Sequence, residues 1–496
     1  MSSPYLLGID TGGTYTDAVI FREPEGVVAK AKSLTTRHDL SLGIAGAVDR
    51  VIAQSGILAS QIGLVSLSTT LATNALVEGQ GGSAALVMIG FSQEDLARGG
   101  LQEALGRDPV VFVPGGHDVH GNELPLDLTA LEEAAAALAG RVSAFAVAGY
   151  FAVRNPAHEV RVRDRLREMT GLPVTCSHEL SSRLGGPRRA LTTLLNARLV
   201  PIIDRLINSC DRFLDSRGVA ASLMVVRGDG ALISAAEARL RPIETILSGP
   251  AASLVGARYL TGLDRAVVSD IGGTTSDVAV LEGGLPRLAE EGAIVGGHRT
   301  MVEAVALRTF GLGGDSEVHI DDRGLTPSIT LGPRRILPLS LIAHHHPEVI
   351  ISTLEKQLKA QRPGRHDARF AVATGLAPPA AQGLRTQDQA LLQRLGSGPV
   401  SLDALLQSAS EKVLMDGLVA RGLVHLCGIT PSDALHVLRQ QGQWNAEAAR
   451  MGFELCARRK DGAGRAIAAS AAELAEAVVA RLTRQSAEAV LATCPA

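Results

Sequence analysis

Short apolar runs alternate with amphipathic segments along the N-terminal third of the chain. Two of these runs, at residues 6–10 and 18–21, flank a glycine-containing turn, which is the pattern of a β-hairpin. The spacing predicts helices over residues 41–55 and 128–138 and buried strands over residues 62–66, 84–89 and 142–148. Strands and helices that alternate in this way are typical of an α/β domain with a mostly parallel sheet.

The pattern is interrupted near residues 176–187, and a long helix predicted over residues 188–209 links the N-terminal part to the rest of the chain. Strands are predicted again at residues 223–226, 266–270, 278–281 and 302–306. A stretch rich in Pro, Ala, Gln and Gly at residues 374–396 is typical of a linker or exposed loop. We therefore expect three domains, at residues 1–185, 186–345 and 346–496, the last of them mostly helical.

One eight-residue pattern occurs twice: residues 10–17 read DTGGTYTD and residues 270–277 read DIGGTTSD, each between two apolar runs. Adjacent glycines let backbone N–H groups approach a phosphate closely, and the threonine hydroxyls add further donors. An aspartate cannot face a phosphate directly, so we expect it to hold Mg²⁺ through water or to orient a nucleophile. The alternative for a single copy is an ordinary hairpin turn. The repeat predicts two α/β lobes of one plan that close around a nucleoside triphosphate.

Two further segments have sequences typical of a tight turn or of a helix N-terminus. Residues 311–316, GLGGDS, form either a close-approach loop for the nucleotide or a tight structural turn. In residues 248–252, SGPAA, the serine is predicted as a helix N-cap, and the helix start either faces an anion or is simply well capped. The sequence contains neither a P-loop motif nor a G-x-G-x-x-G after a strand. Three adjacent histidines at 344–346 make a poor chelate and are expected at a loop or helix end.

Composition excludes several classes of partner. The net charge is −3 and aromatic residues make up 3% of the chain, so neither a basic surface nor stacking platforms for nucleic acid are expected. A helix-turn-helix-like segment with a wing at residues 401–426 lacks a basic face. The five cysteines are scattered without metal-ligand spacing, and the N-terminus has no signal-peptide pattern. We expect a cytoplasmic protein that acts on a small molecule and binds neither nucleic acid nor membrane.

Several longer segments together resemble one family. They read LLGIDTGGTYTDAVIF at 6–21, STTLATNALVEGQG at 68–81, ILSGPAASLVGA at 246–257, VSDIGGTTSDVAVLEGG at 268–284, RTFGLGGDSEV at 308–318 and ITPSDALHVL at 429–438. In this order they resemble the hydantoinase A/oxoprolinase family, a branch of the actin-like and sugar-kinase-like ATPase superfamily, and in particular its shorter members. The resemblance implies a two-lobed actin-like ATPase (ribonuclease H-like) α/β fold with a mostly helical C-terminal extension.

The resemblance also implies an activity. A cyclic amide such as a hydantoin or 5-oxoproline would be opened with ATP and Mg²⁺ by phosphorylation of the amide oxygen. A hydantoinase B-type partner subunit or a homo-oligomer would complete the enzyme. Departures such as Leu67-Ser68, where larger relatives often have His-Gly, concern substrate choice and the hydrolytic step. The alternatives are a sugar-kinase-like small-molecule kinase, a ketone-carboxylase-type ATP-activating subunit and a non-enzymatic actin-like or chaperone-like ATPase.

Carried over residue by residue, the resemblance assigns three groups of side chains. Catalytic roles fall to Asp10, Asp17, Asp270 and Asp277, with Asp10 and Asp270 at the metal. Nucleotide binding falls to Gly12, Gly13, Thr14, Gly272, Gly273, Thr274, Thr275, Gly311, Gly313 and Gly314. Thr69, Thr70, Thr73 and Asn74 are expected to line the cleft near the substrate.

Overall fold

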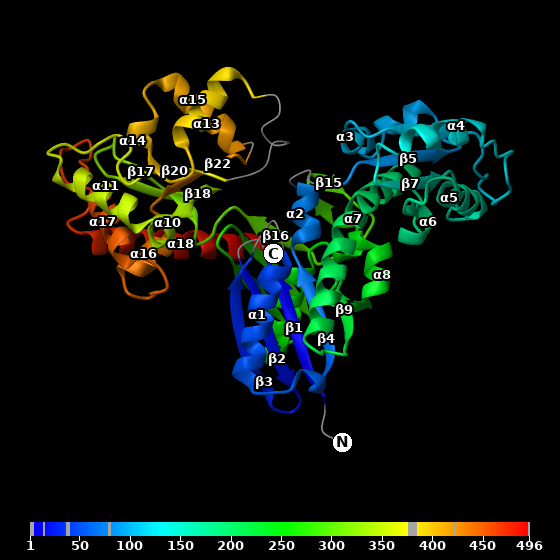
Figure 1. Cartoon of the computed structure of the whole chain (residues 1–496), viewed down its shortest axis with the longest axis horizontal. Coiled ribbons are helices and arrows are strands. Elements are labelled where there is room, and N and C mark those ends of the chain that lie inside the picture. Colours follow the sequence, from blue (N-terminus) through cyan, green and yellow to red (C-terminus); the bar gives the residue numbers. More distant parts are fainter. Residues whose placement is uncertain are drawn as a thin grey trace. The chain divides into compact units, whose positions relative to one another are not determined.

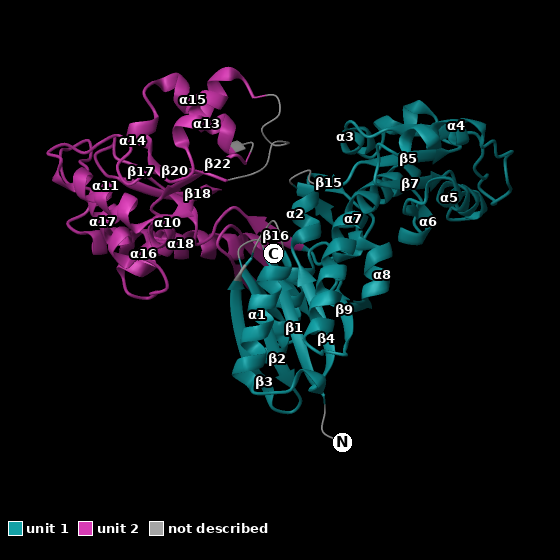
Figure 2. Ribbon diagram, in the orientation of Figure 1, with its two compact units in different colours: residues 1–268, 279–306 teal, residues 269–278, 307–496 magenta. Residues whose placement is uncertain are grey.

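The computed structural model describes residues 4–12, 15–35, 40–77, 81–374, 384–420 and 422–494 (Figure 1). The chain forms two compact units, coloured separately in Figure 2. Unit 1 contains Met1–Val268 and Ala279–Ala306, and unit 2 contains Ser269–Val278 and Leu307–Ala496. The chain thus passes from unit 1 to unit 2 within β11 (Ala266–Ile271) and returns within β12 (Ser276–Glu282).

The first sheet of unit 1 has six strands in the order β10-β9-β4-β1-β2-β3. Its bounds are β1 Tyr5–Thr11, β2 Tyr15–Arg22, β3 Gly26–Leu34, β4 Ile62–Thr69, β9 Ser222–Val226 and β10 Leu232–Ser234. The predicted hairpin is confirmed, because β1 and β2 pair antiparallel, whereas β1, β4 and β9 run parallel. Helix α1 (Leu40–Ser55) packs on β2 and β3 through buried residues such as Val48 and Val51.

The second sheet of unit 1 is parallel, in the order β6-β5-β7-β8. Its strands are β6 Val110–Val113, β5 Ala84–Ile89, β7 Ala144–Gly149 and β8 Val174–Cys176. Alternate residues of β5 and β7 enter two different cores: Leu86 packs with residues of α7 (Gly186–Ser216), and Val87 with residues of α4 (Thr129–Leu138) and α5 (Ala157–Thr170). Helices therefore cover both faces, which explains why these strands are apolar throughout. Helix α7 lies wholly in unit 1.

Shorter elements complete unit 1. They are α2 Leu71–Val77, α3 Leu101–Leu105, α6 Ser177–Leu180, α8 Ala235–Leu240, α9 Ser248–Thr261, β13 Leu285–Pro286, β14 Ile294–Val295, β15 His298–Arg299 and the 3₁₀ turns Ala59–Gln61, Gln93–Ala97 and Pro242–Thr245.

Unit 2 contains a β-hairpin and a separate four-stranded sheet, with helices between and after the strands of that sheet. Its strands are β16 Leu307–Phe310, β17 Ser316–Asp321, β18 Ser328–Arg335, β19 Leu337–Pro338, β20 Phe370–Ala373, β21 Val400–Ser401 and β22 Val424–Gly428. Its helices are α10 Leu339–His345, α11 Pro347–Lys359, α13 Thr386–Leu395, α14 Leu402–Leu405, α15 Ala409–Ala420, α16 Pro431–Val437, α17 Ala446–Ala457 and α18 Ala471–Thr493. Phe370 packs with α10, α11, α17 and α18, whereas Ala371 packs with α13, α14 and α15. The C-terminal region is thus mostly helical around one small sheet.

Three local predictions are corrected. Residues 302–306 form only an isolated bridge at Val305, and the strand begins at Leu307. The predicted linker contains α13 from Thr386, whereas residues 375–383 lie outside the described residues. Strand β22 is not a wing, because it pairs with β19 and β20 and buries Val424 and Cys427.

The histidine run lies where the sequence places it. His344 and His345 end helix α10, as expected for residues at a helix end. No helix among the described residues combines the length and apolar character needed to cross a membrane.

Candidate functional site

The first hairpin of the repeat places two carboxylates opposite each other at one end of the first sheet. Asp10 on β1 pairs in register with Asp17 on β2 and, on its other side, with Ser68 on β4. The Ser68 hydroxyl donates to Asp10 Oδ1 at 2.6 Å. The turn is closed by the Gly12 N–H, which donates to the Tyr15 carbonyl at 2.9 Å. Gly13 and Thr14 lie outside the described residues.

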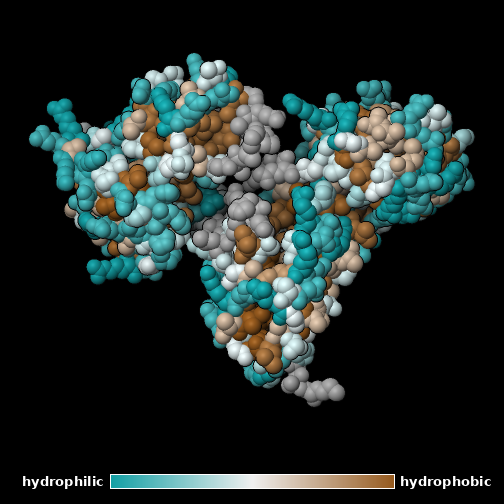
Figure 3. All heavy atoms as spheres, viewed as in Figure 1, coloured by the Kyte–Doolittle hydropathy of each residue, from teal (hydrophilic) through white to brown (hydrophobic). Residues whose placement is uncertain are grey.

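A cavity of about 1030 Å³ in unit 1 opens beside this hairpin. Asp10, Asp17 and Ser68 line it together with apolar residues of β3 and α9. Apolar side chains gather at the β2–β3 end of unit 1 in Figure 3, where Val27 and Val28 are exposed. The carboxylates therefore border a space large enough for a small molecule.

The predicted substrate residues lie at the end of β4, which Thr69 closes, and directly after it. The Thr70 N–H donates to the Thr11 carbonyl at 3.1 Å, which ties this segment to the first hairpin. The Asn74 amide donates to Thr70 Oγ1 at 3.2 Å, and Thr73 Oγ1 accepts from the Leu247 N–H at 3.1 Å. Thr69 and Thr70 thus lie next to the Asp10 hairpin, whereas Asn74 contacts Thr70 and Thr73 contacts Leu247.

Helix α9 begins at the same place, but not with the predicted cap. Ser248 is the first helical residue, and Leu247 is the N-cap in the left-handed region at φ 59°. The Ser248 hydroxyl instead accepts from the Thr69 N–H at 3.2 Å and donates to the Thr69 carbonyl at 3.0 Å. A Cβ on Gly249 would lie 3.7 Å from Asp10 Oδ1, so the helix start approaches the carboxylate. The positive end of the helix dipole favours negative charge there.

The second hairpin repeats the turn of the first. The Gly272 N–H donates to the Thr275 carbonyl at 2.9 Å, as the Gly12 N–H does to Tyr15. Asp277 Oδ1 accepts from the Thr309 hydroxyl at 2.6 Å. Burial raises the pKa of Asp277, the Thr309 hydrogen bond lowers it, and the negative charge of Asp270 raises it again. The negative charge of Asp270 thus disfavours ionisation of Asp277, and a cation at these carboxylates would relieve this effect.

The third glycine cluster packs on this second hairpin in unit 2. The Gly314 N–H donates to the Gly272 carbonyl at 3.1 Å, and the Asp315 N–H donates to the Gly273 carbonyl at 2.7 Å. A Cβ on Gly313 would lie 2.5 Å from Gly272 O and 2.6 Å from Gly273 O. The cluster is thus a close-approach loop against the hairpin backbone, and Gly313 has no room for a side chain.

Two residues that sequence reasoning did not select complete this loop. The Ser432 N–H donates to the Gly314 carbonyl at 2.7 Å, and its hydroxyl donates to Asp315 Oδ1 at 3.3 Å. Arg335 pairs with Asp315 Oδ2 at 3.2 Å, which lowers the Asp315 pKa, although burial raises it more strongly. Ser432 belongs to α16, whose start is capped by Thr430 and Asp433. The only signal for it was the 429–438 motif, which carried no residue-level role.

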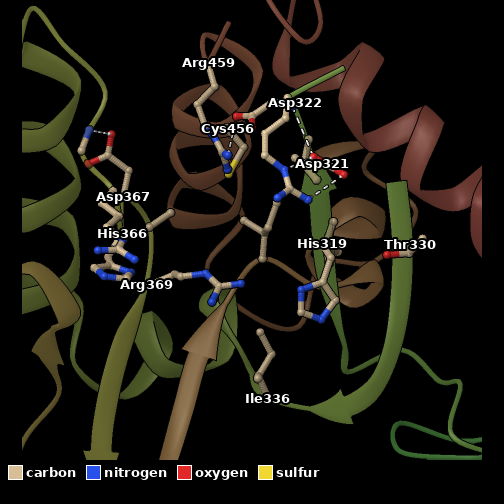
Figure 4. Close-up of a pocket in the computed structure, with 18 of the residues that line it drawn as sticks. His319, Asp321, Asp322, Thr330, Ile336, His366, Asp367, Arg369, Cys456 and Arg459 are labelled. Atoms are coloured by element: carbon tan, nitrogen blue, oxygen red, sulfur yellow. Dashed lines mark hydrogen bonds and ion pairs between the residues drawn. The ribbon is translucent and has the colours of Figure 1, made fainter. Parts of the chain in front are cut away.

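Unit 2 also contains a polar cavity of about 550 Å³, which holds none of the predicted residues (Figure 4). Arg369, Arg459 and His319 point into the region between β17, β20 and α17. Arg459 pairs with Asp322 at 2.5 Å, and Arg369 pairs with the buried Glu317. The positive side chains that line this cavity thus largely have acidic partners.

The sheets, their covering helices and the two hairpins of one pattern define an actin-like ATPase fold. A nucleotide-free acetone carboxylase has this fold with a TM-score of 0.63 and 19% identity, covering 99% of this chain and 63% of that one. The ATP-dependent caprolactamase of Pseudomonas jessenii gives a TM-score of 0.63 and 21% identity with the same coverage. Models of the hydantoinase/oxoprolinase N-terminal region and of hydantoinase/oxoprolinase match residues 6–170 and 189–336. The chain belongs to the hydantoinase/oxoprolinase family.

Several proteins with assigned names are similar to this chain in amino-acid sequence. Caprolactamase subunit alpha of Pseudomonas jessenii is 29% identical over 66% of this chain and 50% of its own length. The gamma subunit of acetophenone carboxylase from Aromatoleum aromaticum is 29% identical over 66% of this chain and 49% of its own length. 5-Oxoprolinase 1 of Arabidopsis thaliana is 27% identical over 68% of this chain and 29% of its own length. The chain thus spans about half the length of the first two relatives and less of the third.

Proposed function

We propose that this chain is the ATP-using component of a hydrolase that opens a cyclic amide such as a lactam, a hydantoin or 5-oxoproline. The observation that carries the proposal is the turn geometry common to both hairpins, each bordered by paired aspartates. The family supports an ATP-dependent reaction at an amide or ketone, since its relatives include a caprolactamase, a 5-oxoprolinase and a ketone carboxylase.

The chemistry explains why ATP is needed. An amide is a poor electrophile because its nitrogen lone pair stabilises the carbonyl. Transfer of the γ-phosphoryl group to the amide oxygen removes this stabilisation and creates a leaving group. A first water adds to the carbon, and the ring C–N bond breaks with a proton passing to nitrogen, which leaves an acyl phosphate. A second water then attacks the acyl carbon, and phosphate departs with the former amide oxygen, so that both carboxylate oxygens come from water.

The described residues fit a nucleotide with its metal. Gly272 and Gly273 leave the backbone of the second hairpin without side chains, as close approach of a phosphate to backbone N–H groups requires. Asp10 and Asp270 would hold Mg²⁺ directly or through water, and the ion would neutralise phosphate charge. Thr70 and Asn74, beside the Asp10 hairpin, are the proposed substrate contacts. Two relatives are named as subunits, which supports a partner subunit for the hydrolytic step.

Isotope tracing tests the reaction. The chain is incubated with Mg-ATP and a panel of lactams and hydantoins labelled with ¹⁸O in the carbonyl, with and without a hydantoinase B-type subunit. We expect stoichiometric ATP consumption and ¹⁸O in the released phosphate. Ring opening without ATP, or label retained wholly in the carboxylate, would contradict the mechanism.

The relationship to a carboxylase gamma subunit favours a second candidate, activation of a ketone for carboxylation. Small ketones with bicarbonate complete the panel, and ATP consumption with ketones alone would favour this second function.

A further inference from the structure

The polar cavity of unit 2 is built from segments that lie outside both hairpins and the glycine cluster (Figure 4). Its walls include residues 318–323 of β17 and the turn after it, residues 364–369 at the start of β20, and Arg459 after α17. Its volume of about 550 Å³ lies in the range of sites for small molecules. The cavity is therefore large enough for a ligand of its own.

The lining of this cavity contains more basic than acidic side chains. The arginine and lysine residues are Arg323, Arg365, Arg369, Lys412 and Arg459, and the acidic residues are Asp321, Asp322 and Asp367. Each of the three acidic side chains already has a cationic partner: Asp321 pairs with Arg323, Asp322 with Arg459, and Asp367 with Arg458. The lining therefore offers no carboxylate whose charge is unpaired.

Two of the basic side chains have no such partner. Arg369 pairs with the buried Glu317, behind the cavity wall. Arg365 and Lys412 are exposed and make no ion pair with any residue in the described part of the chain. The positive charge of these two side chains is thus available to a ligand.

The imidazole of His366 responds to this positive charge. His366 lies in the same wall, and burial is the largest cause of its lowered pKa. The carboxylate of Asp403 opposes this shift, whereas Arg365, Arg369 and Lys412 each lower the pKa further. Three cations therefore act on one ring at the cavity, so their charges converge there.

We propose that this cavity binds a small molecule that carries phosphate or carboxylate groups. The guanidinium of arginine presents several N–H donors in one plane, which match the oxygens of either group, and lysine adds a point charge. Arg365 and Lys412 supply the unpaired charge, and Arg369 and Arg459 point into the same space (Figure 4). A concave surface with surplus positive charge also concentrates anions from solution.

This site differs from the proposed nucleotide site in its chemistry as well as in its residues. The hairpins offer backbone N–H groups and aspartates that need Mg²⁺ to hold a phosphate, whereas the cavity offers cationic side chains that bind an anion directly. Binding in the cavity therefore requires neither a metal ion nor ATP turnover, and the proposal does not depend on the proposed function.

Calorimetric titration of the full chain with two probes, inorganic pyrophosphate and citrate, tests the site. The protein is kept in chelator, so that metal-dependent binding at the hairpins does not contribute. We expect one anion per chain, and we expect its affinity to fall as NaCl is added, because salt screens the attraction. Tighter binding of pyrophosphate indicates a phosphate ligand, and tighter binding of citrate indicates a carboxylate ligand.

Substitutions of the two unpaired cations locate the binding. Arg365→Gln and Lys412→Gln should each weaken it by about 10-fold or more, as expected when a hydrogen bond to a charged group is lost. Arg362→Gln is the matched control, since Arg362 is an exposed arginine of the same loop that does not line the cavity. All three variants remove one positive charge, so net charge alone affects them equally.

The variants of Arg365 and Lys412 should keep the unfolding midpoint of the wild type, because these exposed side chains have no ionic partner to lose among the described residues. Asp270→Asn, in the proposed nucleotide site, should bind both probes like the wild type. The proposal is overturned if neither probe binds, or if the two cavity variants bind both probes as tightly as Arg362→Gln does. A changed affinity in Asp270→Asn would assign the anion to the nucleotide site and would equally overturn it.

Discussion

Gly313→Ala tests whether the glycine cluster and the second hairpin form one rigid loop. The new Cβ would lie 2.5 Å from Gly272 O and 2.6 Å from Gly273 O, whereas ordinary contact begins near 3.4 Å. The hairpin must therefore move by about 1 Å, and overpacking of this kind costs about 1 to 3 kcal/mol. The movement also loosens the hydrogen bonds from Gly314 and Asp315 to the hairpin carbonyls.

Denaturant midpoints and ATPase rates measure the two consequences of this substitution. A displacement of about 1 Å at a reacting centre lowers rates by about 100-fold, so ATP turnover should fall by that order. Gly417→Ala, with no described atom within 4 Å, should be harmless. A Gly313→Ala protein with wild-type stability and turnover would refute the reasoning.

Three further predictions concern carboxylates. Asp270→Asn should abolish Mg-dependent ATP turnover while circular dichroism remains native, and undiminished turnover would remove Asp270 from the metal site. Because the pKa of Asp277 is raised on folding, the folded state holds its proton more tightly, and stability falls as the pH rises through the raised pKa. Asp277→Asn should therefore stabilise the protein more at pH 7 than at pH 4, and denaturant titrations that show no pH-dependent difference contradict this. Glu159→Ala removes the carboxylate beside the buried Arg189 and the acceptor of His178, and should lower the free energy of unfolding by about 3 to 5 kcal/mol. Denaturant unfolding measures this loss, with the exposed Glu168→Ala as the control variant.

Local patterns predicted the hairpins and most strands well. The run around Leu7 and Ile9 is short and apolar, and β5 and β7 are apolar throughout, so composition and length define these elements without tertiary information. The repeat located both turns and the carboxylates that flank them, and the predicted family is confirmed. That the two hairpins face one cleft, and that domains divide at residues 185 and 345, stay predictions.

The remaining site residues could not be selected because their roles depend on contacts distant in sequence. Ser68 contacts Asp10 only through the parallel register of β1 and β4. The sequence around Ser248 predicts an N-cap, yet its hydroxyl hydrogen-bonds the backbone of Thr69, which is distant in sequence.

The way the chain passes between its units imposes an order on biosynthesis. The second hairpin, Ser269–Val278, leaves the ribosome before the glycine cluster and well before Ser432. In the folded chain the glycine cluster packs on this hairpin, and Ser432 packs on the cluster. During translation the hairpin must wait, unpaired with its final neighbours, until nearly the whole chain has been made. Under the proposed function, competence to bind nucleotide is therefore acquired late, and a nascent or prematurely terminated chain that already displays both DxGGT sequences should not hydrolyse ATP.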